Sequence, residues 1–179
     1  MKKSRFLEKL FAKSTGNGQG DYKNLDREKK DMIRGVVELS ESIVKEIMVP
    51  RIDVVFVHID TPIDELLAKV AESRHSRVPM YSKTIDNVIG ILHVKDLVQY
   101  LIKGKDTINI QEIIREPFFV PETKKLNSLL KEFKKRKVHI AVVVDEYGGT
   151  SGVVCLEDII EEIVGDIQDE FDNETEDIL

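Results

Sequence analysis

The chain has 179 residues, of which 41% are apolar and 34% are charged, and its formal net charge is −6. This composition fits one domain or two small units that share a core, and it excludes collagen-like, coiled-coil and low-complexity proteins. Cys155 is the single cysteine, which excludes an internal disulfide and a multi-cysteine zinc site and leads us to expect a cytoplasmic protein.

Residues 1–24 combine a basic segment with a flexible linker. Apolar residues between Phe6 and Phe11 fall on one stripe of a short helix that lysines surround. Two interpretations stay open: a helix that lies peripherally on the inner face of a membrane or on a partner, and a frayed terminus, which the short length favours. The glycines over 16–20 follow no strand, so they predict a linker rather than a dinucleotide site.

Residues 25–50 predict a helical lead-in. From Asp26 onward the pattern becomes helical, with apolar residues at three- and four-residue steps from Met32 to Ile47, and Pro50 ends it. The longest uninterrupted apolar run of the whole chain is Ile140–Val144, far below the roughly 20 residues that span a bilayer. We therefore expect no transmembrane helix in this sequence.

An internal repeat organises the rest of the chain. Gly90–Leu97 returns as Gly152–Ile159 at a displacement of 62 residues, and the block that begins at Arg77 returns at the same displacement. Further upstream, the apolar positions of Ile63–Val70 return in Leu126–Phe133 at a displacement of 63. A repeat of about 60 residues is longer than solenoid periods and predicts two paired subdomains.

The repeat and the charge pattern divide the chain into five parts. After the N-terminal segment at 1–24 and the lead-in at 25–50, we place the first repeat at 51–110 and the second at 111–168. No Lys or Arg follows Lys137, so the remaining residues 169–179 form an acidic tail. The excess of acidic residues in the whole chain argues against nucleic acid as a partner.

Each repeat predicts the same order of elements, β-α-β-β-α. In the first copy a strand over Asp53–His58 precedes a helix that Thr61 caps and Pro62 begins. The further elements of that copy are strands over 78–81 and 88–92 and a helix over 95–101. The second copy predicts strands over 118–120, 140–144 and 151–155 and helices over 126–136 and 156–163. The predicted fold class is α+β, with two repeats packed against each other.

In both repeats a strand runs into a helix through the pattern Gly-h-h-x-x-x-Asp, where h is apolar. His93 and Cys155 stand at the two junctions, and Asp96 and Asp158 follow three residues later. A helix N-terminus can receive phosphate, and a carboxylate beside it can accept from two ribose hydroxyls, which is how a nucleotide is held. An acid at this position also simply stabilises its helix, and the spacing alone leaves both hypotheses open.

Arg77 and the short strand after it are the second candidate feature. A guanidinium beside a cleft can pair with phosphate in a bidentate manner. Pro79 must occupy an edge or a non-bonding position of its strand, which leaves backbone against which a flat base can lie. The second repeat has His139 in place of Arg77 and lacks the proline. The two clefts are therefore chemically different.

The residues predict neither a metal centre nor an enzyme. The histidines lack metal-ligand spacing, and Gly149–Gly152 does not match the nucleophile elbow. Cys155 lies at the end of an apolar strand, which is typical of a small buried residue. The acidic residues between Glu157 and Glu170 are typical of a solvated helix face and would hold magnesium only weakly.

These tandem repeats resemble a CBS-domain pair (a Bateman module) and, more narrowly, the CorC/hemolysin C (TlyC) family. The resemblance covers about residues 25–172. The motifs that carry it are Ile47–Arg51, Ser73–Pro79, Gly90–Leu97, His139–Gly149 and Glu157–Gly165.

The resemblance implies a regulatory module of a protein linked to magnesium and cobalt efflux. It implies ATP or AMP as the ligand, with Mg²⁺ accompanying the phosphates, a homodimer formed through the CBS helices, and a membrane transporter as a partner. It also implies that the sequence is a fragment, cut before a small transporter-associated domain. The alternative is a nucleotide-free module for protein interaction or dimerisation.

The resemblance also implies two sets of site residues. The better cleft would use Met48, Val49, His75, Arg77, Pro79, Val153, Cys155 and Asp158. The second cleft would use Phe118, His139, Ile140, Ile91, His93 and Asp96. The sequence departs from the family at both junctions, because Cys155 replaces a frequent threonine and His93 replaces a small polar residue.

Overall fold

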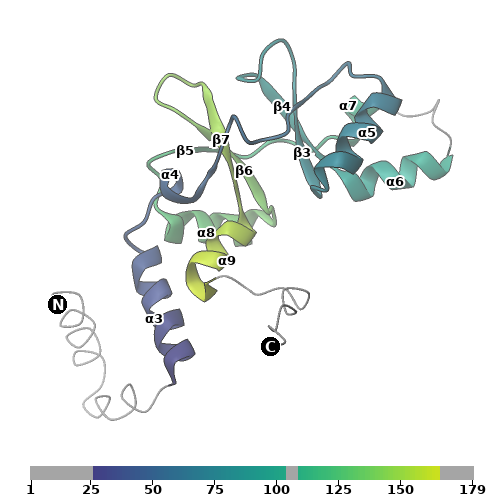
Figure 1. Cartoon of the computed structure of the whole chain (residues 1–179). Helices are drawn as coiled ribbons and strands as arrows, with labels where there is room; N and C mark the ends of the chain where they lie inside the picture. The colour runs from purple at the N-terminus through teal and green to yellow at the C-terminus, as the bar shows by residue number, and fades with distance from the viewer. Residues whose placement is uncertain (1–25, 104–108, 166–179) are drawn as a thin grey trace, which may run out of the picture. The chain divides into compact units, whose positions relative to one another are not determined.

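The computed structural model describes residues 26–103 and 109–165 (Figure 1). One compact unit runs from Ser40 to Ile159, and a second combines the stretches on either side of it. The elements in chain order are α3 (Arg27–Leu39), α4 (Val44–Ile47), β1 (Val49–Pro50), β2 (Val57–His58), α5 (Ile63–Ser73), β3 (Arg77–Tyr81), β4 (Val88–His93), α6 (Val94–Lys103), α7 (Ile110–Ile113), β5 (Phe119–Pro121), α8 (Leu126–Arg136), β6 (Ile140–Val144), β7 (Thr150–Cys155) and α9 (Leu156–Val164).

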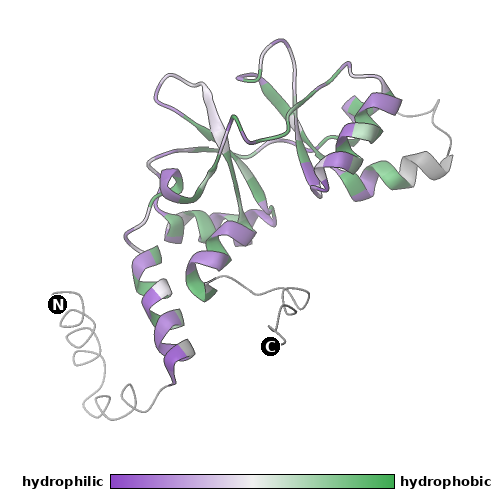
Figure 2. Cartoon of the chain, viewed as in Figure 1, coloured by the Kyte–Doolittle hydropathy of each residue, from purple (hydrophilic) through white to green (hydrophobic). Residues whose placement is uncertain are grey.

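The larger unit contains both repeats except the end of α9, and the predicted α+β class with its doubled β-α-β-β-α order is confirmed. One sheet has the strand order β2-β3-β4, and the other has the order β1-β7-β6-β5. In each repeat the two long strands pair antiparallel and the short strand joins them in parallel. Strand β6 is hydrophobic along its length, whereas α8 combines hydrophobic and hydrophilic residues (Figure 2).

The strand that precedes the first repeat belongs to the sheet of the second. β1 pairs antiparallel with β7, and its register sets Val49 opposite Val153 and Pro50 opposite Gly152. As the edge strand of its sheet, β1 can accommodate a proline. Conversely, Ile113 of α7, at the start of the second repeat, is buried in the core of the first repeat. The two repeats therefore exchange the segments that lead into them.

The glycine of each Gly-h-h-x-x-x-Asp motif lies where the segment that leads into the other repeat, or begins it, passes close to its strand. A Cβ atom on Gly152 would lie 2.1 Å from the carbonyl oxygen of Val49. A Cβ atom on Gly90 would lie 2.6 Å from the side chain of Ile114. Close approach of another segment is therefore the reason for glycine at both positions.

Three details of the predicted elements are wrong. The lead-in is not one helix, because Ile43 forms a β-bridge with Lys125 between α3 and α4. The strand expected from Asp53 is reduced to Val57–His58, since the Asp53 N–H donates to the Pro50 carbonyl in a turn at 2.9 Å. Pro62, not Thr61, is the N-cap of α5, because its extended backbone (ψ 142°) precedes the first helical residue.

Two apolar clusters form much of the core of the larger unit. One lies inside the first repeat, around Leu66, Met80 and Leu97. The other joins the repeats: Val88 and Ile91 of β4 pack there with residues of β6 and β7. In the smaller unit, Gly35 of α3 lies so close to the end of α9 that a Cβ atom would meet the Glu162 carbonyl oxygen at 2.6 Å.

Within the described stretches, every helix falls short of the length and apolar character that a bilayer crossing needs.

Candidate functional site

Arg77 and the start of α9 bring the two repeats together. The Nη1 atom of Arg77 lies 3.4 Å from Oε1 of Glu157, and Nδ1 of His139 lies 3.8 Å from the same oxygen. The Nε atom of Arg77 is buried and has no hydrogen-bond partner among the described residues. A buried donor in this state favours an acceptor that the chain itself does not supply.

Asp158 lies one residue beyond Glu157 on the same helix. Its Oδ2 accepts a hydrogen bond from the N–H of Cys155 at 2.6 Å. This contact is the carboxylate half of a capping box, so Asp158 has the helix-stabilising role that the sequence left open. The same contact holds the carboxylate beside the helix N-terminus, where the motif predicts a ribose to lie.

Asp96, the equivalent residue of the first repeat, is engaged differently. Its Oδ2 accepts from Nε and Nη2 of Arg115 at 3.0 and 2.5 Å. Arg115 and Ile91 also exchange both backbone hydrogen bonds, at 2.8 and 2.9 Å. The start of the second repeat therefore lies along β4 and places a guanidinium on this aspartate. The two clefts differ in charge as well as in residue type.

The apolar residues of the two predicted clefts converge on one place. Val49, Val153 and Cys155, assigned to the better cleft, belong to the cluster that joins the repeats. Ile91 and Ile140, assigned to the second cleft, belong to the same cluster. Five predicted residues thus lie together where the two sheets meet.

A hollow of about 640 Å³ in the first repeat gathers His75, Arg77 and His93. It lies between the second half of α5 and the start of α6, with an apolar wall that includes Leu67 and Val98. His75 is exposed at the end of α5, whereas Arg77 and His93 are half-buried and opposite each other in the β3–β4 register.

The remaining predicted residues are placed as follows. Met48 is the C-cap of α4, and its N–H donates to the Val44 carbonyl at 2.9 Å. Pro79 is buried in β3, beyond the reach of the short strand β2. Phe118 lies against α8, with its ring 6.1 Å from that of Phe133. The structure does not bring Phe118 to the cluster that contains the other apolar site residues.

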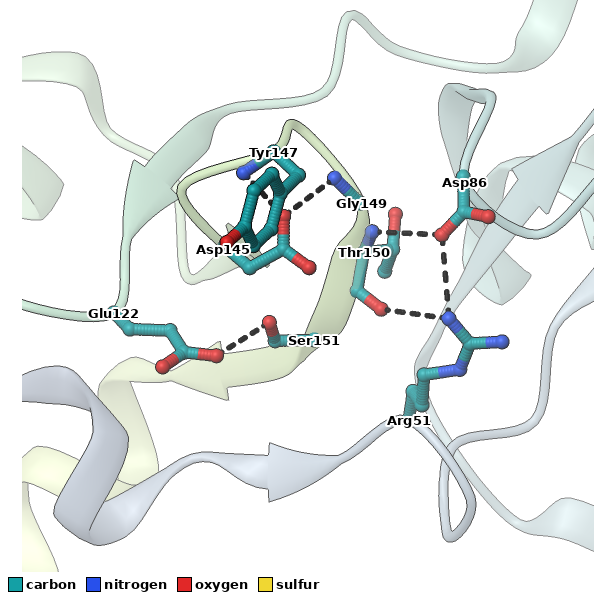
Figure 3. A network of polar contacts seen from close by, with 8 residues as sticks. All are labelled: Arg51, Asp86, Glu122, Asp145, Tyr147, Gly149, Thr150 and Ser151. Atoms are coloured by element: carbon teal, nitrogen blue, oxygen red, sulfur yellow. Dashed lines mark hydrogen bonds and ion pairs between the residues drawn. The ribbon is translucent and has the colours of Figure 1, made fainter.

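Asp86 is a link between the repeats that sequence reasoning missed (Figure 3). Its Oδ1 accepts from the backbone N–H of Thr150 at 2.9 Å and from Nη1 of Arg51 at 3.3 Å. Arg51 directly follows β1, and its N–H donates to the Ser151 carbonyl at 2.8 Å. These contacts hold β1 against β7 and so position Val49.

Glu157 and Arg115 were also missed as site residues. Glu157 stands where the first repeat has Lys95, and Arg115 lies at the start of the second repeat, before β5. Glu157 lies in the recurring block but at a position where the two copies differ in residue type, and Arg115 lies outside the recurring blocks, so the repeat singled out neither. Their contacts with Arg77 and Asp96 are visible only in the fold.

Cys155 has the character of a buried thiol. Burial, with the nearby carboxylates of Asp158 and Glu157, raises its pKa to about 12. The thiolate is the reactive form of cysteine, so this side chain is unsuited to nucleophilic chemistry.

Protonation of His93 is disfavoured in the folded chain. Burial lowers its pKa below the ordinary value, and the charges of Arg115 and Arg77 lower it further, although Asp96 acts in the opposite direction. The unfolded chain therefore binds more protons as the pH falls through about 6.5, and the free energy of unfolding decreases. The decrease ends once the pH is below the folded-state pKa.

We therefore expect His93→Gln to flatten the dependence of stability on pH in urea titrations between about pH 7.5 and 5.5. His75→Gln, a change at the exposed histidine of the same hollow, is the matched control and leaves the dependence in place. A His93→Gln protein that loses as much stability on acidification as the parent would contradict this assignment.

Residues 44–103 and 110–165 both match the CBS domain family model. The chain therefore belongs to the CBS-domain family, as a tandem pair. Over 150 residues it is 48% identical to the magnesium and cobalt efflux protein CorC of Vibrio cholerae, an alignment that covers 84% of this chain and 52% of that protein. It is 39% identical to hemolysin C of Brachyspira hyodysenteriae, with 98% of this chain and 64% of that protein covered.

A solved structure described as the CBS domain of the bacterial CNNM/CorC family Mg²⁺ transporter in complex with ATP superposes with a TM-score of 0.73. It is 45% identical, and the match covers 78% of this chain and 99% of that one. Within the CBS family, this chain thus belongs to the CorC/hemolysin C group, which confirms the assignment made from its motifs. It spans between about half and two thirds of the length of the two curated relatives.

Proposed function

We propose that this chain is a regulatory module that binds an adenine nucleotide, ATP or AMP, where Arg77 meets the start of α9. The observation that carries the proposal is the buried Nε of Arg77, which lacks a partner among the described residues. Phosphate oxygens are strong acceptors for a guanidinium, and the N-terminus of α9 adds a favourable partial charge. The solved relative in complex with ATP supports the same ligand class.

The residues divide naturally between the parts of a nucleotide. Arg77 and His75 would hold the phosphates, and Asp158 would accept from the ribose hydroxyls. The apolar residues would hold the base, among them Met48, Val49, Pro79 and Val153. Among the described residues no group of three or more His, Cys, Asp or Glu could hold a metal ion, so Mg²⁺ would be bound by the phosphates.

The second cleft is expected to bind more weakly. The Asp96 carboxylate accepts two hydrogen bonds from Arg115, and a ribose would have to displace that guanidinium. The chain would therefore bind one nucleotide at low concentration and fill the second cleft only at higher concentration.

Isothermal titration calorimetry with ATP and AMP, each with and without Mg²⁺, tests the proposal directly. We expect one binding event and a raised melting temperature, since a ligand that binds only the native state stabilises it. Absence of heat and an unchanged melting temperature at millimolar nucleotide would leave the alternative, a nucleotide-free interaction module. The ion pair between Arg77 and Glu157 is the observation that favours this alternative.

We further propose that nucleotide occupancy regulates magnesium and cobalt efflux through a membrane transporter, and that the chain forms a homodimer through its CBS helices. The names of the relatives support the link to efflux. Light scattering on the nucleotide-free and nucleotide-bound chain tests the dimer, and a monomer under both conditions would contradict it.

A further inference from the structure

The outer face of α8 is strongly basic. Leu126, Leu129 and Phe133 of this helix are buried against the sheet. The opposite face carries Lys131, Lys134 and Lys135, all exposed and spaced three and four residues apart. Lys137 follows as the exposed C-cap. We call these four residues the α8 lysine face.

The α8 lysine face has no counter-charge within residues 26–103 and 109–165. The neighbouring basic residues are engaged: Lys124 pairs with Glu132 at 2.7 Å, and the Arg136 guanidinium lies 4.5 Å from the centre of the Phe118 ring. None of the four lysines lies within ion-pair distance of a described carboxylate. Within that part of the chain their positive charge is uncompensated.

The repeat provides an internal comparison. At the displacement of 63, Lys131, Lys134 and Lys135 correspond to Ala68, Ala71 and Glu72 of α5. The two helices have the same length and the same left-handed C-cap, with φ of 57° at both. Since α5 folds with two alanines and an acid at these positions, the fold does not require cations there. Lys137 corresponds to Arg74, so both helices are basic at the C-cap. Stabilisation of the helix C-terminus therefore does not explain the other three lysines.

We propose that the α8 lysine face docks on an anionic phospholipid surface. The face is exposed and purely cationic, because every buried apolar residue of α8 points into the core. Protein interfaces draw their affinity from buried apolar and aromatic anchors, which this face lacks. Clustered lysines on a helix instead suit a diffuse layer of lipid phosphates, where each contributes independently.

Co-sedimentation of the whole chain with vesicles tests this. We expect binding to vesicles of equal parts phosphatidylcholine and phosphatidylglycerol, none to pure phosphatidylcholine, and loss of binding as sodium chloride rises from about 0.05 to 0.5 M. The triple variant Lys131→Gln, Lys134→Gln, Lys135→Gln should lower the partition coefficient roughly fivefold per lysine. Glutamine is a good helix former, so the melting temperature should be unchanged.

The matched control removes three lysines from the basic N-terminal segment, as Lys2→Gln, Lys3→Gln and Lys9→Gln. We expect this control to keep most of the vesicle binding. An equal loss in both triple variants would attribute binding to total charge and overturn the assignment to α8, as would unchanged binding of the α8 variant. Stronger α8-dependent binding to polyglutamate or to duplex DNA than to vesicles at equal charge would overturn it in favour of another partner.

Discussion

Gly152→Ala should lower the free energy of unfolding by about 3 kcal/mol, at the upper end of the range for overpacking. The new Cβ atom would lie 2.1 Å from the Val49 carbonyl oxygen, 3.1 Å from the Val49 carbonyl carbon and 3.3 Å from the Pro50 Cα. All three are backbone atoms of β1, so no rotamer change can relieve the clash. β1 must move away and give up its pairing with β7.

Gly90→Ala is the matched control, because it makes the same change at the equivalent position of the first repeat. The atoms that its Cβ would meet belong to the side chain of Ile114 and lie at 2.6 to 2.8 Å. The Ile114 Cδ1 and Cγ1 atoms can rotate away, and only its Cβ, at 2.8 Å, requires a small shift of the backbone. We expect a loss of about 1 kcal/mol there. Neither glycine has a positive φ, which would itself strain an alanine. The difference between the two losses of unfolding free energy therefore depends on the contact with the neighbouring segment alone.

Urea unfolding of both variants measures the two losses. If Gly152→Ala costs no more than Gly90→Ala, β1 does not lie on β7 as described. Nucleotide binding adds a second measurement, since Val49 belongs to the proposed cleft. We expect Gly152→Ala to weaken binding and Gly90→Ala to leave it nearly unchanged.

Most of the fold could be predicted from the sequence because its signals are local and occur twice. The glycine and the aspartate of each motif mark the passage from a strand to a helix, and the period of the apolar residues separates the two element types. β1 could not be predicted in this way. It has two residues, one of them a proline, and its partner β7 lies in the other repeat.

The candidate site could be predicted only in part, for the same reason. Arg77 and Asp158 were found because they occupy motif positions. Glu157 contacts Arg77, and Arg115 contacts Asp96, the repeat equivalent of Asp158. Both Glu157 and Arg115 stand where the other repeat has a different residue type. Ion pairs that occur in one repeat and not in the other depend on tertiary packing. A single sequence contains no pattern from which such pairs can be predicted.

Asp158→Ala should weaken nucleotide binding by roughly tenfold to a hundredfold, the range expected when a charged acceptor of hydrogen bonds is removed. Asp96→Ala should change binding by less than about threefold, because that carboxylate already accepts from Arg115. Calorimetric titration of both variants with the nucleotide that binds the parent chain measures the contrast.

Asp158 also accepts from the Cys155 N–H, so loss of the helix cap could imitate loss of a ligand contact. Asp158→Asn separates the two effects: its side-chain oxygen can still accept that hydrogen bond, while the charge that suits the ribose hydroxyls is gone. We expect this variant to keep the melting temperature of the parent and still bind about tenfold more weakly. A larger effect of Asp96→Ala than of Asp158→Ala would place the nucleotide in the other cleft, where Arg115 rather than Arg77 would meet the phosphates.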